Sequence, residues 1–331
     1  MSESNKRNFI VHGSILAIAG ILVRIIGMLY RIPVVNIIGS EGNGIYGAAF
    51  NIYNIMLVLS SYGLPMAVSK LVSARFTKKR YKSAAKVLRC SLMVAVCTGG
   101  IAALLVFFGA SFIENVIYGG GLPGLAIPLR ILAPTIFLVA ILGVIRGFFQ
   151  GQSTMIPTAV SQILEQIVNA IVSIAAGYGM MKAFASSPDV AAYGAAGSTL
   201  GTAMGALTAV LFMGFLYAVY TPTFNRLKRK DRHTENQSTG QICKIIIYTM
   251  IPIILGQTFY QISALIDDVM FSNIMVGRDI TKSISMDLGN FSSSYSLLIG
   301  IPQGVASAMS ASMLPSVVAS FTDRDLSLIH I

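Results

Sequence analysis

Two arginines lie on one face of the first long apolar run. Arg24 and Arg31 are seven residues apart, which places both on the same side of an α-helix. They share this face with four small residues, Gly13, Ala17, Gly20 and Gly27. A charge near the middle of a membrane span costs about 2.5–3.5 kcal/mol on insertion scales, so Arg24 needs an acidic partner or an anionic ligand. We expect this face to line a close-packed or water-filled interior, although Arg31 could instead extend to the outer interface.

Two further apolar runs carry polar stripes at helical spacing. The fifth run contains Gln162, Glu165, Gln166 and Asn169. Glu165 is the only acid there, and it is either a structural partner of Arg24 or Arg146 or a functional group of the interior. The second run carries the milder stripe of Asn51, Asn54 and Ser61. Hydrogen bonds between helices would account for that stripe, and Asn51 and Asn54 are also candidates to line a substrate cavity.

A pair of carboxylates, Asp267 and Asp268, lies near the end of the seventh apolar run. Adjacent side chains on a helix point about 100° apart, so at most one of the two faces a given site squarely. Hard cations prefer carboxylate oxygens, which makes the pair a candidate for coupling to Na⁺ or H⁺. The alternative is that both carboxylates are hydrated at the outer interface.

No arrangement of residues typical of an enzyme is present. The three histidines are scattered, and no nucleophile lies at a recognisable spacing from a base. Cys90, Cys97 and Cys243 lack the spacing of metal ligands and are interpreted as small packing residues. We therefore predict neither catalysis nor a metal site, and no cofactor beyond a coupling ion.

The composition indicates that lipid surrounds these helices. Of the 331 residues 54% are hydrophobic and 11% charged, and the mean hydropathy is +0.73. A soluble domain carries about 25% charged residues. The sequence predicts an all-α integral membrane protein with about eight spans, each long enough to cross ~30 Å of hydrocarbon. They lie near residues 10–35, 45–70, 86–113, 125–149, 155–183, 190–220, 242–273 and 286–320.

The net charge of +11 is concentrated between the spans. Most of the 24 Lys and Arg residues surround the second and sixth connections, and others precede the first span or follow the fourth and eighth. These positions fall on one side of the membrane, which predicts a cytoplasmic N-terminus and explains the charge without nucleic acid.

A basic stretch after the sixth span divides the chain. We predict a six-helix lobe at 1–225, a cytoplasmic linker at 226–241 and the start of a second lobe at 242–325. Gly63-Leu64-Pro65 in the second span and Gly300-Ile301-Pro302 in the eighth occupy corresponding positions, which favours a parallel repeat. Residues 326–331 read as the translation of a common transposase adapter, so we expect them to be an artefact and the second lobe to be incomplete.

Four segments resemble MurJ- and SpoVB-like flippases of the MOP superfamily, whose members also include MATE exporters. They begin at Val23, Gly63, Arg146 and Pro157, and read VRIIGMLYR, GLPMAVSKLV, RGFFQGQ and PTAVSQILEQ. The resemblance implies two six-helix lobes in a V, a bacterial cytoplasmic membrane location and lipid II, the undecaprenyl-diphosphate-linked peptidoglycan precursor, as substrate. It also implies that Arg24 and Arg31 contact the diphosphate and that Asp267 or Asp268 contributes to a sodium site.

The main interpretation is therefore a lipid II flippase that works by alternating access. An exporter of another polyprenyl-linked polysaccharide and a MATE-type drug or cation antiporter are alternatives within transport. Cationic drugs would favour an acidic cavity over one that contains arginines. A membrane glycosyltransferase would need an acidic catalytic residue on a sizeable outer loop, and the outer loops here are short.

Overall fold

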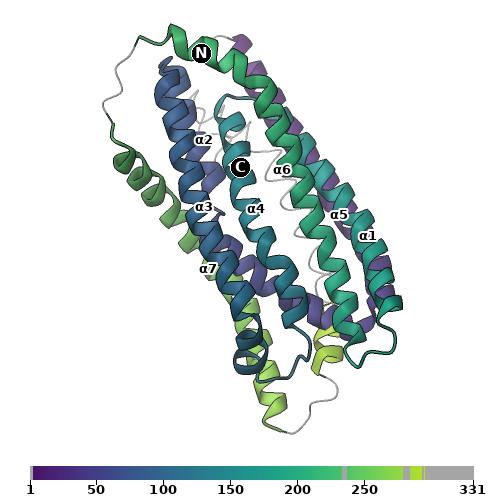
Figure 1. Cartoon of the computed structure of the whole chain (residues 1–331). Coiled ribbons are helices and arrows are strands. Elements are labelled where there is room, and N and C mark those ends of the chain that lie inside the picture. Colours follow the sequence, from purple (N-terminus) through teal and green to yellow (C-terminus); the bar gives the residue numbers. More distant parts are fainter. Residues whose placement is uncertain (1–2, 233–236, 279–283, 293, 295–331) are drawn as a thin grey trace, which may run out of the picture.

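The structure is a computed structural model that describes residues 3–232, 237–278, 284–292 and 294. Every element in these ranges is helical (Figure 1). The elements are α1 (Glu3–Ser60), α2 (Leu64–Thr77), α3 (Tyr81–Phe112), the short π-helix η1 (Ile113–Ile117), α4 (Ala126–Gly151), α5 (Ile156–Ala183), α6 (Val190–Lys230) and α7 (Thr239–Val276). Residues 284–292 are also helical.

A kink at Gly39 divides α1 into two helices. Gly39 has φ 70° and ψ 178°, a conformation in which a residue with a Cβ is strained. The part before the kink contains the predicted first span, and the part after it contains the start of the second. Pro33 lies inside the first part without ending it.

The predicted second span, 45–70, is not continuous. The helix ends at Ser60, residues 61–63 form a turn, and α2 begins at Leu64. Pro65 lies in the first turn of α2, where its missing N–H costs nothing. In a continuous helix the Pro65 ring would clash with the carbonyl group of Ser61, so the chain restarts the helix instead.

The described residues contain six segments that are long and apolar enough to cross a membrane. The first, Ile18–Thr77, includes most of the first predicted span and all of the second, and the next five begin within a few residues of the third to seventh. Most of the predicted eighth span lies outside the described residues, together with Gly300-Ile301-Pro302 and the adapter-like segment. The chain is thus an all-α, multi-pass membrane protein.

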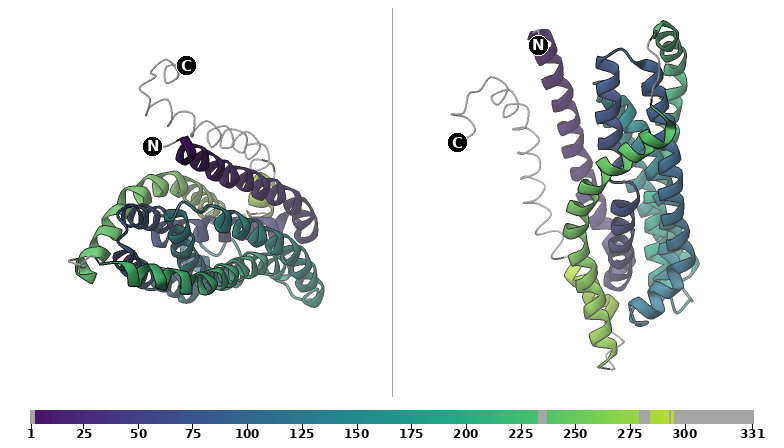
Figure 2. Two further views of the ribbon diagram at one scale, coloured as in Figure 1. Left: turned by 90° about the horizontal axis from the view of Figure 1, so that it is seen from above. Right: turned by 90° about the vertical axis from the view of Figure 1, so that its left-hand side faces the viewer.

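The outward faces of the helices are apolar, as lipid contact requires. Phe108 on α3 is 75% exposed and Phe215 on α6 is 65% exposed. The interior holds two clusters of buried side chains. One surrounds Tyr46, Tyr118 and Leu129, and the other surrounds Phe148 and Phe224. Figure 2 shows the first part of α1 at the margin of the bundle, with the other helices packed together beside it.

The two basic connections lie at the same end of the molecule, as the alternation of charge predicts. The backbone N–H of Lys82, after the α2–α3 connection, donates to the Asp231 carboxylate at the end of α6 (2.8 Å). The N-terminal end of α1 lies toward this end as well (Figure 1). Helix α6 continues to Lys230, so the predicted lobe boundary at 225 falls inside a helix, and α7 begins at Thr239, within the predicted 226–241 linker.

Candidate functional site

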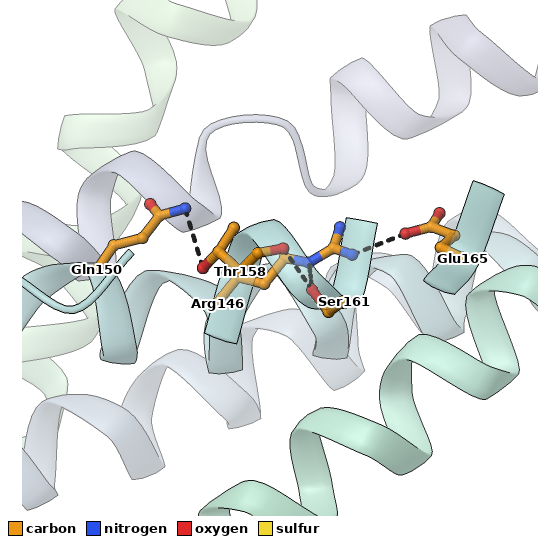
Figure 3. A network of polar contacts seen from close by, with 5 residues as sticks. All are labelled: Arg146, Gln150, Thr158, Ser161 and Glu165. Atoms are coloured by element: carbon orange, nitrogen blue, oxygen red, sulfur yellow. Dashed lines mark hydrogen bonds and ion pairs between the residues drawn. The ribbon is translucent and has the colours of Figure 1, made fainter. Parts of the chain in front are cut away.

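An ion pair joins α4 and α5 in the interior of the bundle. The Arg146 guanidinium donates to the Glu165 carboxylate at 2.7 Å and, through Nε, to the Ser161 hydroxyl at 2.9 Å (Figure 3). The side chain of Arg146 is only 14% exposed. Arg146 lies five residues before the end of α4 at Gly151, near the end of the predicted fourth span. Of the two partners predicted for Glu165, the structure selects Arg146.

The polar stripe on α5 faces α1. The Asn169 side-chain amide donates to the Tyr30 hydroxyl at 3.2 Å, and its carbonyl oxygen accepts from Ser173 at 2.9 Å. The Gln166 amide nitrogen lies 3.3 Å from where a Cβ would be at Gly27. This part of the stripe therefore holds helices together, and it sets the first part of α1 against α5.

Arg24 lies on α1 near the middle of the predicted first span, and its side chain is exposed. Its neighbours Leu22 and Ile25 are 44% and 46% exposed, so the guanidinium emerges from an apolar surface. Glu165 forms its ion pair with Arg146 instead. Because the Arg24 side chain is exposed, its guanidinium is accessible from outside the described part of the bundle.

Arg31 is partly buried and contacts the part of α1 that follows the kink. Its guanidinium donates to the side-chain oxygen of Asn43 at 3.2 Å. It also lies over the Tyr46 ring, 4.6 Å from the ring centroid. Asn43 in turn donates to the backbone carbonyl of Gly289 at 2.9 Å. A chain of contacts therefore joins Arg31 to the helix at 284–292, which begins the predicted eighth span.

The second part of α1 crosses the 284–292 helix at backbone contact. A Cβ at Gly44 would overlap the carbonyl oxygen of Ser285, and a Cβ at Gly289 would overlap that of Ser40. Such close crossings of small residues let membrane helices associate through backbone packing. Asn43 and Gly289 were not predicted as site residues, because a single polar residue and a glycine give no periodic signal.

The two carboxylates of α7 have different surroundings. The Asp268 carboxylate accepts from the Asn51 amide at 2.6 Å, which joins α7 to α1, while Asp267 is exposed. The expected divergence of adjacent side chains is therefore confirmed. Asn54 is half-buried on the same helix as Asn51. Among the described residues no three His, Cys, Asp or Glu side chains cluster as metal ligands do.

Comparison with known proteins identifies relatives along nearly the whole chain. Lipid II flippase MurJ of Bacillus subtilis (strain 168) is 28% identical over 323 residues, which cover 96% of this chain and 59% of the relative. Stage V sporulation protein B of the same organism is 24% identical over 329 residues, with 98% of this chain and 61% of the relative covered. The chain thus spans about three-fifths of the length of these curated relatives.

Solved structures of the MOP superfamily share the fold. A multidrug resistance MATE transporter in its outward-facing conformation matches with a TM-score of 0.64 at 16% identity, over 96% of this chain and 67% of the other. The inward-facing conformation matches with a TM-score of 0.63 at 15% identity, over 94% and 63%. Residues 10–321 match the family model described as polysaccharide biosynthesis protein. The chain therefore belongs to the polysaccharide biosynthesis protein family, and its helices have the MATE-like arrangement of the MOP superfamily.

Proposed function

We propose that the chain belongs to a flippase that moves an undecaprenyl-diphosphate-linked peptidoglycan precursor, lipid II, across the bacterial cytoplasmic membrane. The observation that carries the proposal is the exposure of Arg24 among apolar residues near the middle of the predicted first span. A relative named as a lipid II flippase, matched over 96% of this chain, supports the choice of substrate.

A diphosphate is a suitable ligand for this arginine. The planar guanidinium matches two phosphate oxygens at once, and it keeps its charge where an ammonium would lose it on burial. Arg31 lies seven residues further along the helix, about 10 Å away, and its guanidinium is already bound by Asn43. In this proposal the exposed Arg24 makes the first contact with the diphosphate, and Arg31 responds through Asn43 when the lobes move.

The contacts of the 284–292 helix support alternating access. The crossing at Gly44 and Gly289 and the Asn51–Asp268 hydrogen bond both join α1 to the part of the chain after the basic linker. These contacts would close one face of the transporter and break when it opens to that side. In our proposal the basic end lies in the cytoplasm, so the crossing closes the outer face.

Coupling to Na⁺ or H⁺ would supply the energy for repeated movement in one direction. We assign this role to Asp268, because its carboxylate is half-buried and shares a hydrogen bond with the helix that closes the outer face. Protonation or cation binding would change that hydrogen bond. Asp267 is exposed and would be the hydrated neighbour.

Binding to the purified chain tests the proposal without requiring transport. Native mass spectrometry should detect undecaprenyl diphosphate and lipid II on the wild-type chain and at least about tenfold weaker binding to Arg24→Ala, as expected for loss of a charged hydrogen bond. Arg278→Ala, which removes an exposed arginine elsewhere, is the matched control. Equal binding of both lipids by Arg24→Ala and the wild type would contradict the proposal.

The same titration separates the candidate substrates. Preference for lipid II over undecaprenyl diphosphate attached to an unrelated glycan supports a peptidoglycan precursor. The reverse preference would indicate the alternative in the same family, an exporter of another polyprenyl-linked polysaccharide. Joining the chain to the remaining part of the Bacillus relative would then allow complementation in cells depleted of their own flippase.

A further inference from the structure

We propose that the basic end of the bundle is a binding surface for anionic phospholipid headgroups. The surface, called here the basic platform, consists of segments 78–82 and 228–232. Each segment contains four Lys or Arg residues, and the only carboxylate in either is Asp231. The proposal concerns a different end of the molecule from Arg24 and does not depend on the transported substrate.

Tertiary structure brings the two segments together, although about 150 residues separate them in sequence. The Asp231 carboxylate accepts from the backbone N–H of Lys82 at 2.8 Å. Beneath this contact the rings of Phe76 and Phe224 are stacked, with centroids 6.0 Å apart and planes 7° apart. The Phe148 ring packs edge-on against Phe224 at 5.3 Å. This aromatic support fixes the ends of α2 and α6 beside each other.

The platform is strongly positive, with eight basic residues and one acid, Asp231, in its two segments. Asp231 is 5% exposed, and its carboxylate accepts a hydrogen bond from a backbone N–H. This negative charge is therefore buried beneath the exposed basic side chains. Lys78, Lys79, Arg80 and Lys82 are exposed, and so are Arg229, Lys230 and Arg232. Like charges gathered on a fixed surface repel one another, and an anionic partner relieves that repulsion.

Residues at the start of α7 are held close to the platform by side chains of α2 and α3. Arg75 donates to the Gln237 side chain at 2.8 Å, and the Lys86 ammonium donates to the Gln237 backbone carbonyl. Ser238 then caps α7 with reciprocal hydrogen bonds to Gln241. A ligand that occupies the platform would therefore also stabilise the packing of the start of α7 beside α2 and α3.

The partner is a lipid because the surface beside the charges is apolar. Met93 on α3 is 48% exposed and Val219 on α6 is 62% exposed, each about 15 Å along its helix from the platform. The acyl chains of a phospholipid whose phosphate lies on the platform would extend along this apolar surface. Juxtamembrane clusters of four to eight basic residues attract anionic lipids in this way.

The test compares lipid binding by the purified chain and two triple variants in native mass spectrometry. The platform variant is Lys78→Gln/Arg229→Gln/Lys230→Gln. The control variant, Arg130→Gln/Lys182→Gln/Arg278→Gln, removes three exposed cations outside the platform. We expect the wild type to bind phosphatidylglycerol in preference to phosphatidylcholine. The platform variant should bind phosphatidylglycerol at least about tenfold more weakly, and the control variant should resemble the wild type.

Two additions make the outcome decisive. Glycerol phosphate, the soluble headgroup, should fail to compete at concentrations at which phosphatidylglycerol saturates, because it lacks the acyl chains. Binding of undecaprenyl diphosphate by the platform variant should remain as in the wild type if its fold is intact. Equal loss in both triple variants, no preference for the anionic lipid, or full competition by glycerol phosphate would each overturn the proposal.

Discussion

The ion pair between Arg146 and Glu165 offers a quantitative test of how this bundle is stabilised. Its atoms are 2.7 Å apart and its side chains are 14% and 27% exposed, so the pair is mostly but not fully desolvated. Replacement of Glu165 by Leu keeps a similar volume and leaves the Arg146 charge with only the Ser161 hydroxyl as its named partner. An uncompensated buried charge costs about 3–5 kcal/mol, and partial exposure reduces this to about 2–3 kcal/mol here.

Three variants separate the ion pair from simple loss of packing. Glu165→Gln retains a carbonyl oxygen that can accept from Arg146, so we expect a loss of about 1 kcal/mol. Arg146→Leu/Glu165→Leu removes both charges, and we expect it to be more stable than Glu165→Leu by about 2 kcal/mol, because no charge is left unpaired. Arg130→Leu, which removes an exposed hydrogen bond to Ser111, should change stability by less than about 0.5 kcal/mol.

The free energy of unfolding can be measured in mixed micelles, with denaturing detergent as titrant and circular dichroism as readout. The signal is suitable because the described elements are helical. A double variant no more stable than Glu165→Leu would refute the reasoning, since the cost would then come from packing rather than from an unpaired charge. Equal losses for Glu165→Gln and Glu165→Leu would refute it as well.

Three further predictions concern the crossing, the carboxylates and the topology. Gly44→Val should destabilise the chain by at least about 2 kcal/mol in the same assay, because its side chain overlaps the backbone opposite Gly44, whereas substitution at the exposed Gly240, which has open space around it, should have little effect. The melting temperature of the wild-type chain should be higher in Na⁺ than in K⁺, or should change with pH. This effect should disappear in Asp268→Asn and persist in Asp267→Asn, and the same response in both variants would argue against coupling through Asp268. A cysteine introduced at Lys79 in a cysteine-free background should react with an impermeant reagent only after the cells are permeabilised, and labelling in intact cells would reverse the proposed orientation.

The sequence was sufficient to predict the class of fold and much of its layout. Long apolar runs with few charges require lipid on the outside and internally hydrogen-bonded helices within it. The third to seventh predicted spans correspond to α3, α4, α5, α6 and α7. The alternation of basic connections correctly predicted that the α2–α3 and α6–α7 connections share one end, because side-to-side alternation follows from counting spans alone.

Local rules were less reliable where a single residue decides a boundary. Pro65 restarts a helix that hydropathy predicts as continuous, since apolar composition does not register the missing N–H. Pro222 lies inside α6, and the helix continues beyond residue 225 to Lys230.

Only the tertiary structure decided which polar residues meet. Helical spacing places Glu165 on a face of α5, yet only the packing of α4 against α5 selects Arg146 over Arg24 as its partner. Asn43 contacts Gly289 across 246 positions of sequence, and Asn51 contacts Asp268 across 217. Periodicity determines the face of a single helix, whereas the pairing of faces depends on how side chains of several helices fit together in three dimensions.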